Sequence, residues 1–406
     1  MKSISYLLNV YVIAISLYII ACQDSEPPTS SHAHTSSYSD TEARNEEDNE
    51  SHEDHDILLI PNGLPQPKVP TDNPLSRAKV ELGRFLFYDT KLSGNQTYSC
   101  ATCHQQQLAF TDGLPVAKGS TDELHTLGSM SLVNVAYNAT LGWGNPLLVT
   151  LEEQALVPMF GEEPVELGFT SPNEEWLNRF RNDSDYPQRF TEAFPEDEDP
   201  ISVGNIAKAI ASFERTLISF NSPYDRYQNG DEDALTNAQK RGMDLFFSES
   251  IECFHCHGGF NFTDSIASAD FPFSETPFHN NGMYNVGGEG RYPQNQGVFE
   301  VTRRDKDLGT FKAPSLRNIA VTAPYLHDGS VATLEEMIDL YASGGRHILD
   351  GDQAGDGREH PNKSAFVAGF ELSPAERDDL VAFLQALTDE SFLTNPTLSN
   401  PFMIDE

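Results

Sequence analysis

Two short motifs constrain the fold of this chain more than any other feature of its sequence. Segments 100–104 (CATCH) and 253–257 (CFHCH) each place two cysteines three positions apart, with a histidine directly after the second cysteine. This spacing suits a c-type haem, because both thiols can form thioethers to the vinyl groups while the histidine binds the iron. Half a zinc site or two structural thiols would fit one motif alone, but the repetition favours two haem c groups. The residues concerned are Cys100, Cys103, His104, Cys253, Cys256 and His257.

The fifth cysteine, Cys22, ends an apolar run that covers residues 4–20. A lysine precedes the run, and the run ends in Ile-Ile-Ala-Cys, which resembles a bacterial lipoprotein signal. We therefore expect residues 1–21 to be removed and Cys22 to be lipidated, so that the acyl chains tether the protein to a membrane. An uncleaved membrane anchor is the alternative. Both readings place the chain in the periplasm or cell envelope, where haem attachment is completed.

Charge and length restrict the partners and the number of domains. The 62 acidic and 26 basic residues give a net charge of −36, which argues against nucleic acid as a partner. Residues 22–56 are acidic and have no apolar period, so we predict a disordered tether there. The remaining chain is long enough for two cores. We expect a first, peroxide-reacting haem domain over 57–230 and a second, electron-transfer haem domain over 231–406.

Apolar periodicity predicts helices over 75–88, 201–220, 333–341 and 374–387. The first of these precedes the first motif, and a similar apolar pattern with a glycine precedes the second motif. The two glycines are Gly83 and Gly242. A glycine inside a helix costs about 1 kcal/mol relative to alanine, so we expect another helix or the haem to approach each of them closely. The fold should be mainly α, with two cytochrome c-like domains and long irregular loops.

Four further segments resemble the bacterial di-haem cytochrome c peroxidases and the related methylamine utilisation protein MauG. They are AFTDG at 109–113, LEEQALVPMFGEEPVELG at 151–168, AIASFERTLIS at 209–219 and GTFKAPSLRNIAVTAPYLHDGSVATLEEMIDLY at 309–341. The tail at 387–402, LTDESFLTNPTLSNPF, is most similar to the MbnH-like di-haem enzymes. This resemblance implies a di-haem oxidoreductase that reacts with hydrogen peroxide.

The resemblance also implies roles for individual residues. His104 resembles the ligand of the peroxide-reacting haem, and His257 resembles that of the electron-transfer haem. Trp143 matches a tryptophan that relays electrons between the haems, although a packed core aromatic is the alternative. Three residues match the pocket above the first haem: Gln154, Pro158 and Glu166. Among them, Glu166 would act as general base and then as general acid, because peroxide cleavage moves a proton from one oxygen to the other.

The second ligand of the second haem distinguishes the subtypes, since the peroxidases use a methionine where MauG uses a tyrosine. Tyr341 occupies this position when it is counted from segment 324–327. Met337 lies one helical turn earlier on the same face and is a competitor. We predict Tyr341, whose phenolate would stabilise a high oxidation state better than a thioether would.

Two further positions depart from the peroxidase pattern. Thr322 and Pro324 match residues that help to hold a calcium ion in the peroxidases, but Gly128 stands where their asparagine would lie. Calcium therefore stays an open alternative. His125 lies near the histidine that caps the resting first haem in the peroxidases, yet not at its position. We interpret His125 as a loop histidine and expect the first haem to be open.

Three functions follow from these residues. The first is oxidation of an aromatic residue, a tryptophan by resemblance, on an exported MbnP-like partner protein with hydrogen peroxide as the oxidant. The second is a cytochrome c peroxidase that takes electrons from a small cytochrome or cupredoxin. The third is a non-catalytic di-haem electron carrier, which would leave Gln154 and Glu166 without a task.

Overall fold

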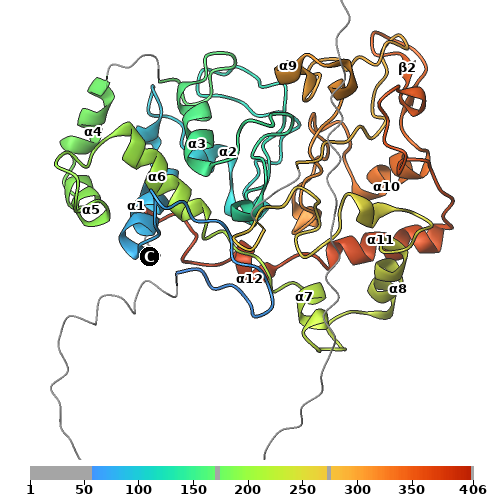
Figure 1. Cartoon of the computed structure of the whole chain (residues 1–406), viewed down its shortest axis with the longest axis horizontal. Helices are drawn as coiled ribbons and strands as arrows, with labels where there is room; N and C mark the ends of the chain where they lie inside the picture. Colours follow the sequence, from blue (N-terminus) through green and yellow to red (C-terminus); the bar gives the residue numbers. More distant parts are fainter. Residues whose placement is uncertain (1–56, 170–173, 272–275, 404–406) are drawn as a thin grey trace, which may run out of the picture. The chain divides into compact units, whose positions relative to one another are not determined.

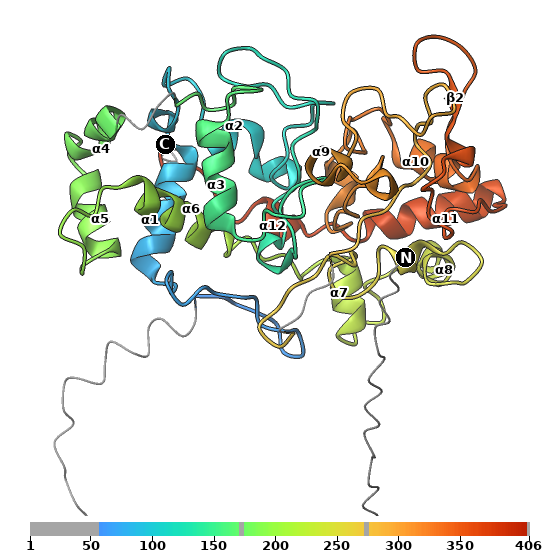
Figure 2. The same cartoon turned by 45° about the horizontal axis from the view of Figure 1, so that its top comes forward.

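The computed structural model describes residues 57–403, except 170–173 and 272–275. The expected signal peptide, Cys22 and the tether at 22–56 lie outside the described residues. The described chain is mainly helical, with long irregular loops and one short antiparallel strand pair (Figures 1 and 2). Among the described residues, no helix combines the length and apolar character needed to cross a membrane.

The helices and strands have the following bounds. The first group of helices is α1 (Arg77–Tyr88), α2 (Cys100–Cys103), α3 (Leu151–Phe160), α4 (Asn178–Arg181), α5 (Tyr186–Ala193), α6 (Val203–Glu214) and α7 (Pro223–Gln228). The second group is α8 (Asn237–Phe246), α9 (Phe299–Thr302), α10 (Leu334–Ala342), α11 (Pro374–Gln385) and α12 (Glu390–Leu393). The strands are β1 (His347–Ile348) and β2 (Gly355–Asp356). The four helices predicted from periodicity are confirmed as α1, α6, α10 and α11.

Local sequence signals explain where the main helices begin. Ser76 and Ser202 accept hydrogen bonds from main-chain N–H groups in the first turns of α1 and α6. Thr236 begins α8 in a reciprocal capping arrangement with Gln239. Ser373 caps α11 in the same way with Glu376, and a proline occupies the first helical position, where no N–H is needed.

The same close helix crossing occurs twice. Helix α1 packs against α6, and α8 packs against α11; each pair lies side by side in Figures 1 and 2. A Cβ added to Gly83 would lie 1.9 Å from the carbonyl oxygen of Ala209, and one added to Gly242 would lie 1.9 Å from that of Asp379. The expected close approach is therefore confirmed, and its partner in each case is a helix.

Two apolar cores accompany these helix pairs. The first contains side chains of α1, α3, α5 and α6, and the second contains side chains of α8, α10 and α11. The chain order does not follow this division throughout. Phe392 and Leu398, near the C-terminal end, are buried in the first core, and α12 lies between the two groups of helices in Figure 1. Tyr224 of α7 packs against the second core.

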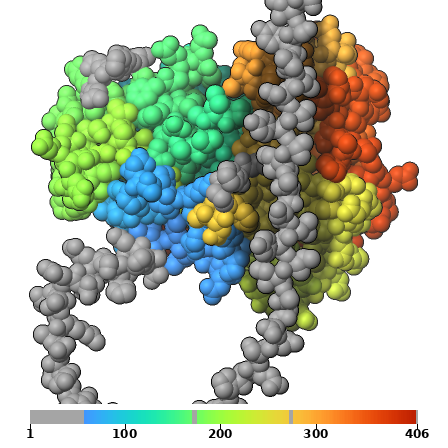
Figure 3. Space-filling view, viewed as in Figure 1, coloured from blue at the N-terminus to red at the C-terminus, as the bar shows by residue number. Residues whose placement is uncertain are grey.

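Loops also connect the two groups. Arg317 forms a buried bidentate pair with Asp225 of α7, with N–O distances of 2.8 and 2.9 Å. The main-chain N–H of Ala269 donates to the carbonyl of Gln66 at 2.8 Å. In Figure 3, residues coloured gold lie next to the blue residues from the N-terminal part of the described chain. The domain bounds at 57–230 and 231–406 stay a prediction.

The glycine crossings lead to a stability prediction. Gly83→Ala or Gly242→Ala should each lower the free energy of unfolding by about 1–3 kcal/mol, because the added methyl group forces the opposing main chain away. Gly204→Ala is the matched control, since this glycine lies in the first turn of α6 and its Cβ would meet only Ser202 Oγ, at 4.0 Å. There the change should stabilise the helix by up to about 1 kcal/mol. Denaturant unfolding followed by circular dichroism measures all three; equal effects would contradict the close crossings.

Candidate active site

The first motif forms a single helical turn that ends at its histidine. Ser99 N donates to Thr102 Oγ1 at 3.0 Å, and His104 N donates to Cys100 O at 3.0 Å. The imidazole Nδ1 of His104 lies 2.7 Å from the carbonyl oxygen of Phe110. Because a carbonyl only accepts, Nδ1 carries the proton and Nε2 is left free to bind a metal. Burial lowers the pKa of His104, which favours this neutral form.

The second motif repeats this arrangement. His257 Nδ1 lies 3.3 Å from the carbonyl oxygen of Phe262 and 3.1 Å from that of Pro314. Phe110 and Phe262 both have a positive φ, 61° and 51°, which is uncommon for a residue with a side chain. This left-handed turn directs each phenylalanine carbonyl back toward the motif histidine. Both histidines therefore have the tautomer that an iron ligand requires.

A cavity of about 240 Å³ adjoins the second motif. It exceeds by far the roughly 10–15 Å³ that one water molecule needs. Its lining includes Cys253, Cys256, His257, Trp143, Met337 and Tyr341. The buried side chain of Lys312 also lines it and donates to the Thr140 carbonyl at 2.8 Å. Burial lowers the pKa of Lys312 to about 7. A haem c fits this donor set, because its thioethers, iron and acidic propionates match the cysteines, the histidine and the buried lysine.

The two candidates for the second ligand lie one turn apart on α10, and both line this cavity. Burial is the main cause of the raised pKa of Tyr341. A hydrogen bond with Asn281 acts in the opposite direction but does not cancel the rise. The structure brings both side chains to the second motif, so the assignment of Tyr341 over Met337 stays a prediction.

Trp143 lies between segments of both halves of the chain. Its indole Nε1 donates to the carbonyl of Gly128 at 2.9 Å, and its own carbonyl accepts from Lys312 N at 2.8 Å. Thr322 and Pro324 line the same cavity. The Thr322 hydroxyl donates to the Ile319 carbonyl at 3.1 Å. Calcium binding by this segment stays a prediction.

The three residues expected above the first haem come from α3 and from the loop that follows it. Gln154 and Pro158 are one turn apart on α3, and Leu167 N donates to the Pro158 carbonyl at 2.8 Å. This bond holds the loop that carries Glu166 against the helix. Burial raises the pKa of Glu166. The pKa values of both thiols in the first motif are raised, mainly by burial. The negative charge of the Glu166 carboxylate adds to this rise, so the carboxylate lies within electrostatic reach of the thiols.

An ion pair between the buried Arg215 and the partly buried Glu152 fixes the other end of α3. Arg215, which follows α6, binds both carboxylate oxygens of Glu152 at 2.8 and 2.9 Å, and Asn73 Nδ2 donates to the same carboxylate at 2.7 Å. Pairs of this bidentate kind restrict geometry as well as supplying attraction. Helix α3 is therefore held at both ends, which fixes the direction in which Gln154 and Pro158 project.

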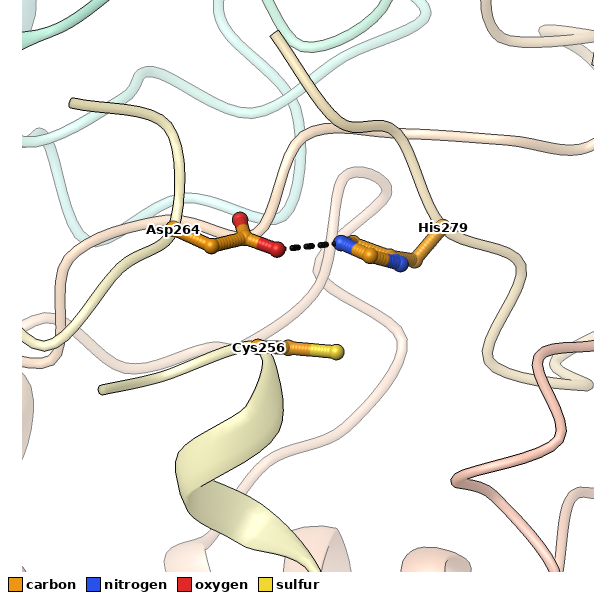
Figure 4. A group of neighbouring side chains, drawn as sticks. All are labelled: Cys256, Asp264 and His279. Atoms are coloured by element: carbon orange, nitrogen blue, oxygen red, sulfur yellow. Dashed lines mark hydrogen bonds and ion pairs between the residues drawn. The ribbon is translucent and has the colours of Figure 1, made fainter. Parts of the chain in front are cut away.

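Sequence reasoning missed two contacts near the motifs. His125 is a loop residue, as expected, but its Nε2 lies 3.9 Å from Glu166 Oε1. Near the second motif, His279 Nε2 lies 2.6 Å from Asp264 Oδ2, with the Cys256 side chain beside the pair (Figure 4). Burial alone would lower the pKa of His279, but the hydrogen bonds with Asp264 and Cys256 outweigh it and raise this pKa to about 10. No residue spacing in the sequence indicates either contact.

Comparisons with known proteins decide the family. The family model for di-haem cytochrome c peroxidase matches residues 77–233, and the model described as RoxA-like, cytochrome c-like matches residues 310–342. Cytochrome-c peroxidase IdrP1 of Pseudomonas sp. (strain SCT) is 35% identical over 356 residues, which cover 84% of this chain and 89% of the relative. This chain belongs to the di-haem cytochrome c peroxidase and MauG family.

Two other members of the family are similar over most of their length. Methylamine utilization protein MauG of Methylorubrum extorquens is 33% identical, with 83% of this chain and 85% of the relative covered. The crystal structure of a MauG-like protein associated with microbial copper homeostasis is 49% identical, with a TM-score of 0.83 and coverage of 85% and 99%. The chain is thus a peroxidase-type oxidoreductase with cytochrome c-like domains, and family membership implies two haem c groups.

The competing ligands on α10 can be separated by substitution. Tyr341→Phe should change the low-spin haem signal in the electron paramagnetic resonance spectrum of the resting protein, because the ring loses the oxygen that would bind iron. Met337→Leu keeps the volume and removes the sulfur, and it should leave the signal unchanged. The reverse pattern would assign the ligand to Met337.

Proposed function

We propose that this protein is an exported di-haem c oxidoreductase that reacts with hydrogen peroxide at the His104 motif and oxidises a tryptophan of an MbnP-like partner protein. The observation that carries the proposal is the position of Glu166, whose carboxylate lies within electrostatic reach of both thiols of the first motif and whose loop is bonded to α3 at Pro158. A carboxyl group with a raised pKa in this place has a task in peroxide chemistry and none in simple electron transfer. The similarity to MauG and to the MauG-like structure supports the protein substrate.

The haems, when bound, supply the redox chemistry, and the residues of the chain position peroxide and move its protons. Glu166 would accept a proton from one oxygen of peroxide and return it to the departing oxygen, which leaves as water. Gln154 would orient the peroxide by hydrogen bonding. In the proposed mechanism, electrons pass between the two motifs through the indole of Trp143, which lines the second cavity and donates to the Gly128 carbonyl.

The N-terminal signal supports export of the protein. The net charge of the chain indicates the kind of partner. Lipidated Cys22 would hold the protein at a membrane of the cell envelope, and the two haems would be attached there. A net charge of −36 favours a partner with a basic face, which long-range attraction would steer toward this enzyme. Tyr341 as a ligand at the second motif would suit the storage of oxidising equivalents for such a partner.

A peroxidase that takes electrons from a small cytochrome or cupredoxin is the second candidate. Met337 lines the second cavity as well and would supply the ligand used by the peroxidases. The 35% identity to cytochrome-c peroxidase IdrP1 supports this alternative. A non-catalytic electron carrier would need two axial ligands on both irons, and it accounts for neither Glu166 nor Gln154.

Electron paramagnetic resonance before and after peroxide addition separates these functions. We expect one high-spin and one low-spin ferric signal that are lost together on peroxide addition, followed by oxidation of a partner tryptophan, seen by mass spectrometry. A first haem that opens only after prior reduction would instead favour the peroxidase. Two low-spin signals that do not respond to peroxide would exclude both enzymes.

The role of Glu166 predicts a kinetic effect. Glu166→Gln should slow the reaction with peroxide by about 10²–10⁴-fold, because the amide cannot exchange the proton. Glu162→Gln is a matched control, since Glu162 belongs to the same loop but is exposed. Stopped-flow absorbance measures both rates, at equal haem content. Equal rates in the two variants would remove Glu166 from the mechanism.

A further inference from the structure

His125 is held by a narrow hairpin that covers residues 117–127. Ala117 N donates to the Leu127 carbonyl at 3.0 Å, His125 N donates to the Ala117 carbonyl at 2.8 Å, and Gly119 N donates to the Glu123 carbonyl at 2.8 Å. These main-chain bonds fix the position of His125, although the residue lies outside helices and strands.

The hairpin also contacts both parts of the first site. The Lys118 carbonyl lies 3.8 Å from Cys103 Sγ, within the first motif. On the other side, Ser120 N donates to the Glu166 carbonyl at 2.7 Å, and Val165 N donates to Glu123 Oε2 at 2.9 Å. A Cβ on Gly119 would lie 1.8 Å from the Val165 carbonyl oxygen, so the two loops touch through their main chains. His125 is therefore positioned together with Glu166.

The hydrogen bonds of the imidazole determine which of its nitrogens carries the proton. Leu127 N donates to His125 Nδ1 at 3.0 Å, so Nδ1 is an acceptor. In the neutral ring the proton must then be on Nε2, and this is the nitrogen that faces Glu166. Burial lowers the pKa of His125, which maintains the neutral form with its Nε2–H.

The gap between the two side chains suits an oxygen atom. The distance of 3.9 Å from His125 Nε2 to Glu166 Oε1 is too long for a direct hydrogen bond. A single oxygen placed beside this gap can lie about 2.8 Å from both atoms and bond to each of them. His125 then offers a hydrogen-bond donor, and Glu166 offers an acceptor or an exchangeable proton.

We propose that His125 is a further catalytic residue of the first site, which donates a hydrogen bond from Nε2 to the peroxide oxygen that departs. This inference rests on the proposed peroxide chemistry. The O–O bond breaks and its electron pair goes to the departing oxygen, which takes the proton held by Glu166 and leaves as water; the bound haem would supply the two electrons that the other oxygen requires. His125 keeps its own proton and stabilises the negative charge that develops on that oxygen.

Two substitutions at this position separate a hydrogen-bond donor from a structural residue. In His125→Asn, the amide oxygen can still accept from Leu127 N, but its N–H₂ falls short of the position of Nε2. This variant should react with peroxide about 10²-fold more slowly, which is typical for the loss of one donor. In His125→Gln, the amide N–H₂ reaches the position of Nε2, so the rate should recover to within about tenfold of the wild type. His347→Asn, at an exposed histidine, is the control.

Cyanide binding to the resting ferric protein supplies a readout other than activity. We expect weaker cyanide binding in His125→Asn than in His125→Gln, with haem content and the resting electron paramagnetic resonance spectrum unchanged in both. Equal rates and equal cyanide affinities in the two variants would overturn the proposal. A low-spin signal that becomes high-spin in His125→Asn would also overturn it, since His125 would then be an iron ligand.

The outcome does not depend on the partner protein. If peroxide reacts with a rate that depends on His125 but no partner tryptophan is oxidised, the proposed function fails and the role of His125 stands. If the wild type does not react with peroxide, the proposed function fails, and the cyanide comparison still decides whether His125 donates into the first site.

Discussion

The hydrogen bond from each motif histidine to a main-chain carbonyl is the interaction on which the arrangement of the site depends. It is made by His104 with Phe110 and by His257 with Phe262 and Pro314. This bond turns the imidazole so that Nε2 faces away from its own loop, and it selects the tautomer that can bind iron. The cost is a left-handed main-chain conformation at a phenylalanine, which the surrounding buried aromatic side chains stabilise.

The two motifs differ in the residues that surround them. Around the second motif, the cavity is lined by Trp143, Tyr341, Met337 and the buried Lys312, a set of side chains that a haem c fits. Near the first motif, the Glu166 carboxyl group and the neutral His125 imidazole lie 3.9 Å apart, which is too far for a direct hydrogen bond. The second motif thus adjoins a cavity, and the first motif adjoins two titratable side chains.

Much of the fold was predictable from the sequence, because its signals are local. Helices α1, α6, α10 and α11 follow from apolar period and capping residues, and the glycines in α1 and α8 indicated the close crossings before their partners were known. The contacts of His125 with Glu166 and of Asp264 with His279 were not predictable. They join loops whose main-chain paths are set by turns and by long-range hydrogen bonds, and neither leaves a periodic pattern. The packing of the C-terminal segment in the first core was not predictable for the same reason.

The position of that C-terminal segment determines when the first core can be completed during folding. Phe392 and Leu398 belong to the core that α1 begins, more than three hundred residues earlier. During synthesis, the N-terminal half must therefore wait for the last segment before this part of its apolar surface is covered.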